Sequence, residues 1–377
     1  MAKKPFTPIP PMAELPPAEE INVQEILDKY LSGEIDLICV LGPTASGKTK
    51  YAVQLARQIN QLLKTIRGGS ASEKRATPLA AGGGAHSDGV GGVLFAADPV
   101  LMAGAEIISA DSRQVYRGMD IGTGKDLNEY EEIPYHLMDI VDAGTKYNIF
   151  EYQRDFEKAY KDIVDRGGIP ILCGGSGLYI EAATCGYSLP EVPPDPELRA
   201  ELEKKTDEEL IAQLASLKPL HNNTDYDTRK RLIRALEIAI YEAEHPVQHT
   251  AFLPKNTYYI GTLVTREVRN AKIDARLDAR LEEGMVEEIR SLIDGTHPAM
   301  CTTDADGNTL PGKPIDPEDL IYYGLEYKFV TLYLIGELTF DQMRTQLATA
   351  IHQFAKRQMT WFRGMERKGI TIHWTAV

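Results

Sequence analysis

One eight-residue segment limits the folds open to this chain more than any other feature. Residues 42–49 have the sequence GPTASGKT, which satisfies the pattern G-x-x-x-x-G-K-[ST] of phosphate-binding loops. The continuous apolar run at residues 35–41 precedes it and is typical of a buried parallel strand. The apolar positions after Thr49 recur with the spacing of one helix face. A strand, a glycine loop and a helix in this order predict an α/β domain that holds a phosphate group.

The residue types of this loop suit a diphosphate or a polyphosphate. Glycines let consecutive backbone amides point at phosphate oxygens, and the start of the helix adds a partial positive charge. Lys48 adds a full positive charge, and the Thr49 hydroxyl is placed to ligate Mg²⁺, which is the expected cofactor. Kinases, NTPases and enzymes that hold a diphosphate leaving group share this loop, so the reaction stays open here. The expected diphosphate contacts are Gly42, Pro43, Thr44, Ala45, Ser46, Gly47, Lys48 and Thr49.

Strand and helix patterns alternate along the rest of the chain. Residues 106–110 and 170–173 are apolar and predict further strands, with a helical pattern before the second one. This alternation predicts an α/β fold with a P-loop NTPase-like parallel sheet, covered by helices on both faces. After the proline-rich residues 190–196 the sequence is charged and strongly helical. We therefore expect a P-loop core formed by residues 21–190 and 256–377, with a mostly helical domain inserted at 191–255.

Two segments are expected to add nothing to the packed cores, one before the P-loop core and one inserted within it. Residues 1–20 are rich in proline and predict a disordered leader. Residues 66–104 consist mainly of small residues, which predicts a flexible surface insertion, with a mobile lid as the alternative.

Toward the C-terminus, residues 258–264 predict a strand that returns to the sheet. The helical patterns beyond it cover residues 266–293, 317–335 and 340–363, with a polar loop at 295–316.

The composition limits the possible partners. Asp and Glu outnumber Lys and Arg by 55 to 41, and the net charge of −14 counts against nucleic-acid binding by the whole surface. Only a local basic patch would serve such a partner. No stretch approaches the roughly 18 consecutive apolar residues of a membrane-spanning helix, so no membrane partner is expected. The four cysteines are widely spaced and suggest neither a zinc site nor disulfides. We expect a cytoplasmic monomer.

Asp111 is the strongest candidate for chemistry outside the phosphate loop. It follows the strand expected at residues 106–110, and ligands of open α/β sheets bind outside the carboxyl ends of the strands. A carboxylate at this position could act as a general base or ligate magnesium through water. The alternative is a helix N-cap.

Several separated segments together carry a family resemblance. GPTASGKT, ISADSRQVYRGMDIGTGK, PYHLMDI, GGSGLYIEA and KRQMTWFRG resemble, in order and spacing, the segments of the tRNA dimethylallyltransferase (tRNA isopentenyltransferase) family. The resemblance covers roughly residues 35–375 apart from the glycine-rich insertion. The chain has no C-terminal Cys/His zinc finger, so it is more similar to the bacterial type than to the eukaryotic one.

The resemblance implies a prenyl transfer. Members of this family move the dimethylallyl group of dimethylallyl diphosphate to the exocyclic N6 amine of the adenosine just 3′ of the tRNA anticodon and release diphosphate. By family match Asp111 would be the general base, and Lys48 would stabilise the leaving group. Ser176 stands where the family usually has threonine and Arg276 matches an arginine that reaches the diphosphate. The alternatives are a loop residue for Ser176 and a solvated helix face for Arg276.

The resemblance also implies contacts with the anticodon stem-loop. The basic run at residues 229–234 matches the family segment that holds the anticodon loop, and Arg199 matches another contact. A solvated helix face is the alternative for this run. The expected tRNA contacts are Asp111, Ser112, Arg113, Gln114, Ser176, Arg199, Lys230, Arg231, Leu232, Ile233 and Arg234.

The chain departs from the family at residues 321–327. Many bacterial members have approximately R-x-x-G-Y-[RK]-[QE] there, whereas this sequence is IYYGLEY, with Glu326 in place of a basic residue. This change could mean altered tRNA choice or a different acceptor, and three other functions stay open for the chain. They are an isopentenyltransferase for free adenine nucleotides, a P-loop small-molecule kinase, and a non-catalytic RNA-binding relative.

Overall fold

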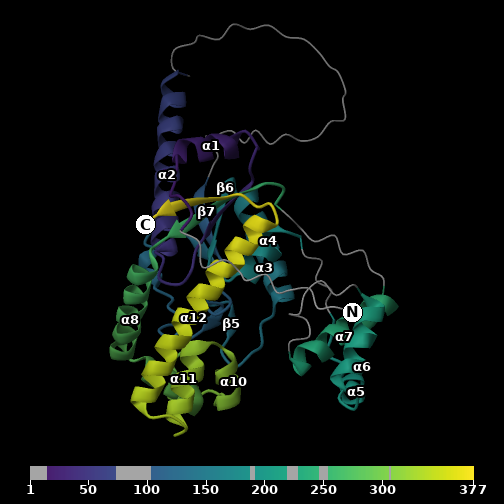
Figure 1. The fold of residues 1–377 in the computed structure, drawn as a ribbon. Helices are drawn as coiled ribbons and strands as arrows, with labels where there is room; N and C mark the ends of the chain where they lie inside the picture. The colour runs from purple at the N-terminus through teal and green to yellow at the C-terminus, as the bar shows by residue number, and fades with distance from the viewer. Residues whose placement is uncertain (1–14, 74–102, 187–191, 219–227, 246–253, 305–306) are drawn as a thin grey trace.

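The core of the molecule is a parallel sheet. The computed structural model describes residues 15–73, 103–186, 192–218, 228–245, 254–304 and 307–377. Six strands form the central sheet in the order β10-β7-β1-β6-β2-β4 (Figure 1), and each neighbouring pair runs parallel. The strands are β1 (Leu37–Leu41), β2 (Gly104–Ser109), β4 (Tyr135–His136), β6 (Gly168–Gly174), β7 (Thr257–Leu263) and β10 (Ile372–Ala376). The predicted α/β class is confirmed.

Strand β1 shows why the apolar run before the phosphate loop is continuous. Ile38 and Val40 pack into one apolar cluster with α1 (Val23–Leu31) and α2 (Lys48–Glu73). Residues 37, 39 and 41 belong to a second cluster on the other face. All five residues are buried, because helices cover both faces of the sheet. The second cluster draws on α3 (Ile149–Asp165), α4 (Gly177–Thr184), α8 (Arg266–Glu283), α9 (Met285–Asp294), α10 (Pro317–Tyr322), α11 (Leu325–Leu334) and α12 (Phe340–Arg367).

The helices of the predicted insertion form a body with its own small core, which lies beside the sheet domain in Figure 1. Leu210 and Leu214 of one helix pack against Leu232 and Leu236 of another. Thr206 and Glu209 form a capping box that fixes the start of the first of these two helices. The helices are α5 (Pro196–Leu202), α6 (Asp207–Leu217) and α7 (Arg229–Glu244). The helical character expected after residue 196 is therefore present.

Short elements connect the main ones near the carboxyl ends of the strands. The strands β3 (Tyr116–Arg117) and β5 (Val141–Asp142) pair in parallel, and a 3-10 helix, η2 (Leu127–Glu129), lies between them in the chain. The expected polar loop after α9 contains an antiparallel pair, β8 (Thr302–Thr303) and β9 (Thr309–Leu310).

The structure corrects several expected boundaries. Helix α2 continues to Glu73, so the first part of the insertion predicted at 66–104 is helical, and its residues 74–102 lie outside the described residues. The helix predicted at 266–293 is two helices, because Gly284 adopts φ +105° between them. The sequence also missed β10, whose short apolar pattern follows a long helix.

The predicted leader is partly anchored. Residues 15–20 lack helix and strand, but the Glu19 backbone N–H donates to the Trp374 carbonyl at 2.6 Å, and a Glu19 carboxylate oxygen lies 3.0 Å from His373 Nδ1. Residues 1–14 lie outside the described residues. Within the described part of the chain, no helix is long and apolar enough to cross a membrane.

Candidate active site

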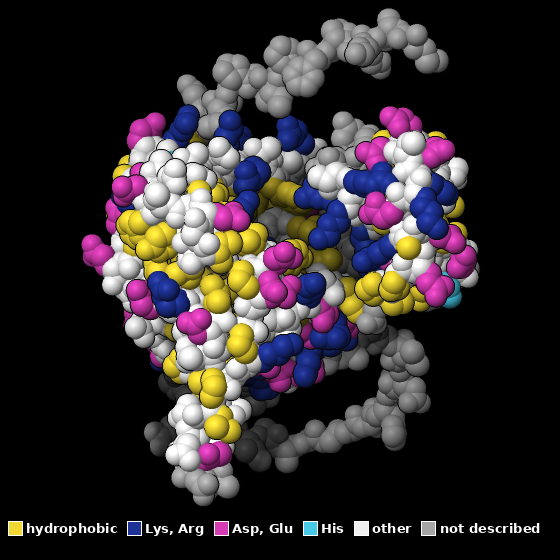
Figure 2. Space-filling view, turned by 90° about the horizontal axis from the view of Figure 1, so that it is seen from below, with side chains coloured by type: hydrophobic (Ala, Val, Ile, Leu, Met, Phe, Trp, Pro, Cys, Tyr) yellow, Lys and Arg dark blue, Asp and Glu magenta, His cyan; other side chains and the backbone are white. Residues whose placement is uncertain are grey.

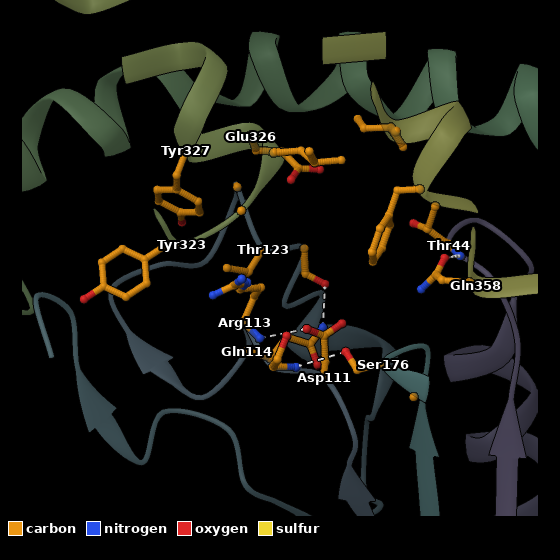
Figure 3. A pocket seen from close by; sticks show the side chains of 18 of the residues that line it. Thr44, Asp111, Arg113, Gln114, Thr123, Ser176, Tyr323, Glu326, Tyr327 and Gln358 are labelled. Carbon is orange, nitrogen blue, oxygen red and sulfur yellow. Dashed lines mark hydrogen bonds between the residues drawn. The ribbon is translucent and has the colours of Figure 1, made fainter. Parts of the chain in front are cut away.

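The carboxyl ends of the central strands open into a cavity of about 420 Å³. The phosphate loop forms one side of this cavity, and the residues after β2 and β6 form its floor (Figure 3). Helices α8 and α12 and the turn between α10 and α11 supply the remaining walls. Of the predicted site residues, those that line the cavity are Thr44, Lys48, Thr49, Asp111, Ser112, Arg113, Gln114, Ser176 and Arg276.

Gln358 of α12 holds the phosphate loop in place. Its side-chain oxygen accepts a hydrogen bond from the Thr44 backbone N–H at 2.8 Å, and its amide nitrogen donates to the Gly175 carbonyl at 2.8 Å. The side chain is only 7% exposed, so these bonds are shielded from water. Gln358 therefore joins the phosphate loop to the loop after β6. The sequence placed this residue in a family segment but gave it no role.

The other residues of the phosphate loop differ in whether they reach the cavity. The Ser46 hydroxyl is buried and lies 2.7 Å from the Thr262 hydroxyl, turned away from the cavity. Gly42 and Pro43 are also buried, so only their backbone could reach a phosphate. Burial lowers the pKa of Lys48 from its usual value, whereas the nearby Asp111 carboxylate favours the charged amine.

Asp111 caps a turn and not a helix. Its Oδ1 accepts a hydrogen bond from the Arg113 backbone N–H at 2.9 Å, and its own N–H donates to the Ser109 hydroxyl at 3.3 Å. Residues 112–115 form bends and turns and no helix begins there, so the N-cap alternative does not apply. Ser176 lies beside this turn and its hydroxyl accepts from the Ser112 N–H at 3.3 Å. The carboxylate is thus held at the floor of the cavity, as Figure 3 shows.

Gln114 and Glu288 fix the loop that follows β3. Gln114 donates to the Gly124 carbonyl at 3.1 Å, and its side-chain oxygen accepts from Ser109 at 3.2 Å. The buried Glu288 carboxylate of α9 accepts from three consecutive backbone N–H groups, those of residues 120–122, at 2.7 to 3.1 Å. It also accepts from the Tyr327 hydroxyl at 2.8 Å. The sequence gave no indication of this anchor, because Glu288 lies in an ordinary amphipathic helix.

Two arginines of α8 enter the cavity from the same side. Arg276 pairs with Asp126 and donates to the Gly124 carbonyl at 3.4 Å. It also lines the cavity with Lys48, which excludes the alternative of a purely solvated helix face. Arg280 lies one helical turn further along and lines the same cavity, although the sequence analysis did not select it.

The predicted tRNA contacts of the helical domain fall into three groups. Leu232 is 1% exposed and Ile233 is 4% exposed, so both pack the domain core and present no side chain to RNA, which corrects the prediction. Arg199 donates to both oxygens of Glu237, at 2.9 and 2.7 Å, and Arg234 pairs with the same carboxylate. The exposed members of the set are Lys230 and Arg231.

Arg199 and Arg234 stabilise the helical domain through the buried carboxylate of Glu237. Its carboxylate is buried in the domain, and the hydrogen bonds from Arg199 and the Asp195 backbone outweigh burial and lower its pKa. Arg234 also donates to the Val192 carbonyl at 2.8 Å. These bonds tie the first described residues of the insertion to α7. Figure 2 shows further Lys and Arg side chains along the hollow between the helical domain and the core.

The fold and the cavity together define a P-loop α/β protein with a carboxylate in the same cavity as its phosphate loop. The model of the IPP transferase family matches residues 114–365. A tRNA dimethylallyltransferase 2 of Bacteroides fragilis is 50% identical over 345 residues, which cover 90% of this chain and 92% of that protein. A tRNA dimethylallyltransferase 1 of Parabacteroides distasonis is 49% identical over 343 residues, with 90% and 92% covered. The chain belongs to the IPP transferase family.

Solved structures agree with this assignment. The tRNA isopentenylpyrophosphate transferase of Bacillus halodurans has a TM-score of 0.53 at 28% identity, with 91% of this chain and 89% of that chain covered. A eukaryotic dimethylallyltransferase acting on tRNA has a TM-score of 0.59 at 22% identity, with 86% of this chain and 69% of that chain covered. At this identity the likeness supports the fold alone. The fold expected from the sequence is thus shared with this family.

Proposed function

We propose that this chain transfers the dimethylallyl group of dimethylallyl diphosphate to the N6 amine of the adenosine 3′ of the anticodon in tRNA. The observation that carries the proposal is that Lys48 of the phosphate loop and the carboxylate of Asp111 face one cavity. One group suits a diphosphate and the other suits an amine that must lose a proton. The curated relatives at about half identity are named for this activity.

The positive groups of the cavity suit the departure of the donor's diphosphate. When the allylic C–O bond breaks, its electron pair leaves with the diphosphate and negative charge grows on the oxygens. Lys48, Arg276 and the amides of the phosphate loop would stabilise that charge. Lys48 and Arg276 line the cavity before the donor binds, and Arg276 would exchange its ion pair with Asp126 for one with the leaving group.

Magnesium fits this site. The Thr49 hydroxyl and the Asp111 carboxylate bring oxygen donors to the same cavity, and Mg²⁺ commonly takes one or two protein oxygens together with substrate phosphates. We propose that Thr49 is the protein ligand nearest the diphosphate. When bound, the ion would neutralise the charge that develops on the leaving group.

Asp111 would complete the reaction at the acceptor. As the N6 lone pair forms the new C–N bond, the amine gives a proton to the Asp111 carboxylate. The hydrogen bond from the Arg113 N–H fixes the orientation of that carboxylate. Tyr322 and Phe354 line the cavity and are 55% and 37% exposed, so an unstacked base could stack on either ring. An arginine lies over each ring, Arg113 over Tyr322 and Arg357 over Phe354.

An adenylate isopentenyltransferase remains the second candidate function. It would use the same cavity but would need no surface for an anticodon stem. The helical domain with exposed Lys230 and Arg231, together with the names of the relatives, favours tRNA as acceptor. We propose that the chain acts on tRNA as a monomer.

The proposal is tested by expressing this chain in a bacterial strain that lacks its own tRNA dimethylallyltransferase. Mass spectrometry of nucleosides from purified tRNA should show N6-dimethylallyl adenosine, or a further modified form of it. The Asp111→Ala variant, expressed at the same level, should give little of this product. Absence of any prenylated adenosine with folded wild-type protein present would reject the proposal.

A further inference from the structure

Arg280 is a buried cation in the wall of the cavity. Its side chain is 9% exposed, and within the described part of the chain its Nη2 atom has no hydrogen-bond partner. A buried guanidinium that lacks a partner is costly, because it gives up its bonds to water and receives nothing in return. Such a group in a native cavity calls for an explanation.

Arg280 also lies beside a second positive charge. A Cβ atom added to Gly124 would stand 1.6 Å from the Nη2 atom of Arg280 and 2.7 Å from the Nη2 atom of Arg276. Both guanidinium groups therefore lie close to the same glycine, and a larger residue there would require them to move. Placing two like charges together in a desolvated cavity favours an anion between or beside them.

The acidic groups near Arg280 do not fully neutralise the positive charge of the two arginines. They are Glu326, Asp126 and Glu283, and Asp126 already pairs with Arg276. Glu326 is itself partly buried, and burial raises the pKa of its carboxyl, with Arg280 acting against that change. Burial also lowers the pKa of Arg280. Neither group is therefore fully compensated by the other.

The surroundings of Arg280 point to a phosphate group close to the phosphate loop. A second, small cavity is lined by Thr44 and Ala45 of that loop and by Arg276, Arg280 and Glu326. A backbone phosphate of an RNA would have to enter deeply to reach a side chain so well buried. The diphosphate of the donor would instead be held by the phosphate loop, two residues of which line this small cavity.

We propose that Arg280 binds the diphosphate of the donor together with Arg276, and that Glu326 limits the strength of this contact. The inference rests on the proposed function, because it concerns the same donor. It assigns a role to a residue outside the family segments recognised in the sequence. It also gives Glu326, which replaces a basic residue, a function in setting donor affinity.

Calorimetry with inorganic pyrophosphate and Mg²⁺ tests this proposal on the full chain. Arg280→Met keeps the length of the side chain and removes its charge, so pyrophosphate affinity should fall about 10- to 100-fold. The Arg280→Lys variant should lose less pyrophosphate affinity, because it keeps the positive charge. Glu326→Gln should increase the affinity several-fold, because it removes the competing carboxylate. Arg344→Met, which alters an exposed arginine paired with Asp278, is the matched control and should bind as the wild type does.

Binding of an anticodon stem-loop RNA, measured in parallel, distinguishes the two sources of phosphate. Its affinity should stay unchanged in the Arg280 and Glu326 variants. Weaker RNA binding with unchanged pyrophosphate binding would overturn the proposal, and so would equal pyrophosphate binding by wild type and Arg280→Met. If Arg280→Met does not fold, unchanged or weaker binding by Glu326→Gln would overturn it. A wild-type chain that binds no pyrophosphate would reject the proposed function as well.

Discussion

Asp111 is placed by its neighbours in the chain and not by a distant partner. The Arg113 N–H and the Ser109 hydroxyl hold it in a turn directly after β2, where the backbone leaves the sheet. A side chain so fixed can meet the acceptor without first being ordered, and this saves conformational entropy at the moment of reaction.

Replacement of Asp111 by alanine should therefore affect rate more than binding. Loss of a general base should lower turnover by about 100-fold or more. Steady-state transfer assays would give the turnover number, and filter binding would give the tRNA affinity, which should change little. An equal loss of both quantities would show that Asp111 maintains the structure of the turn and does not take a proton.

At the scale of elements, α12 joins two loops that are far apart in the sequence. Gln358 accepts from the phosphate loop and donates to the loop after β6, so the helix fixes the position of Thr44 relative to the floor of the cavity. The shape of the diphosphate site thus depends on a helix that lies far from the phosphate loop in the sequence.

Gln358→Ala should raise the Michaelis constant for dimethylallyl diphosphate several-fold, because the loop loses a buried hydrogen bond worth about 0.5–1.5 kcal/mol. Gln353→Ala removes an exposed glutamine from the same helix and serves as the control. The two variants should differ in donor affinity while their helical content, followed by circular dichroism, is the same. Identical Michaelis constants would contradict the role assigned to Gln358.

Helix α9 fixes the loop at residues 120–124 through Glu288, whose carboxylate accepts three backbone hydrogen bonds from that loop. Glu288→Gln replaces one acceptor oxygen with a donor that faces backbone N–H groups, so the free energy of unfolding should fall by about 1–3 kcal/mol. Urea titration measures this change, and Glu287→Gln, at an exposed position, is the matched control. Equal stability of the two variants would show that the carboxylate is not needed by the loop.

At the scale of the whole molecule, a chain of net charge −14 must still attract a polyanion. The structure concentrates exposed basic side chains at the start of α7, where Lys230 and Arg231 lie outside the domain core. Several other arginines of the domain are used in its ion pairs. A local patch of this kind fits an acidic protein that binds RNA at one face.

Charge reversal at both positions should weaken tRNA binding and make it less dependent on salt. The slope of log affinity against log salt concentration should decrease by roughly 1 to 2 in the Lys230→Glu/Arg231→Glu variant. Pyrophosphate binding should stay unchanged. Lys64→Glu/Lys158→Glu carries the same change in net charge on other helices and should leave the slope as it is. An equal effect of both double variants would assign the result to net charge alone.

The sequence predicted four of the six strands of the central sheet, β1, β2, β6 and β7, because each contains an apolar run, and the phosphate loop has a strict pattern. It did not predict β4 or β10. It predicted Lys48, Thr49 and Asp111 at one cavity, because strand ends meet at one edge of a parallel sheet. It could not predict Gln358, Glu288 or Arg280, which act through contacts between distant segments. Leu232 and Ile233 were assigned to RNA because a linear motif does not show which side chains face a core.

Transfer of the dimethylallyl group can be measured directly in a single assay. Radiolabelled dimethylallyl diphosphate and Mg²⁺ are offered with bulk tRNA in one reaction and with AMP, ADP and ATP in another. We expect label in tRNA, and none in a tRNA that lacks adenosine 3′ of the anticodon. Label in the free nucleotides alone, or in neither acceptor, would contradict this account.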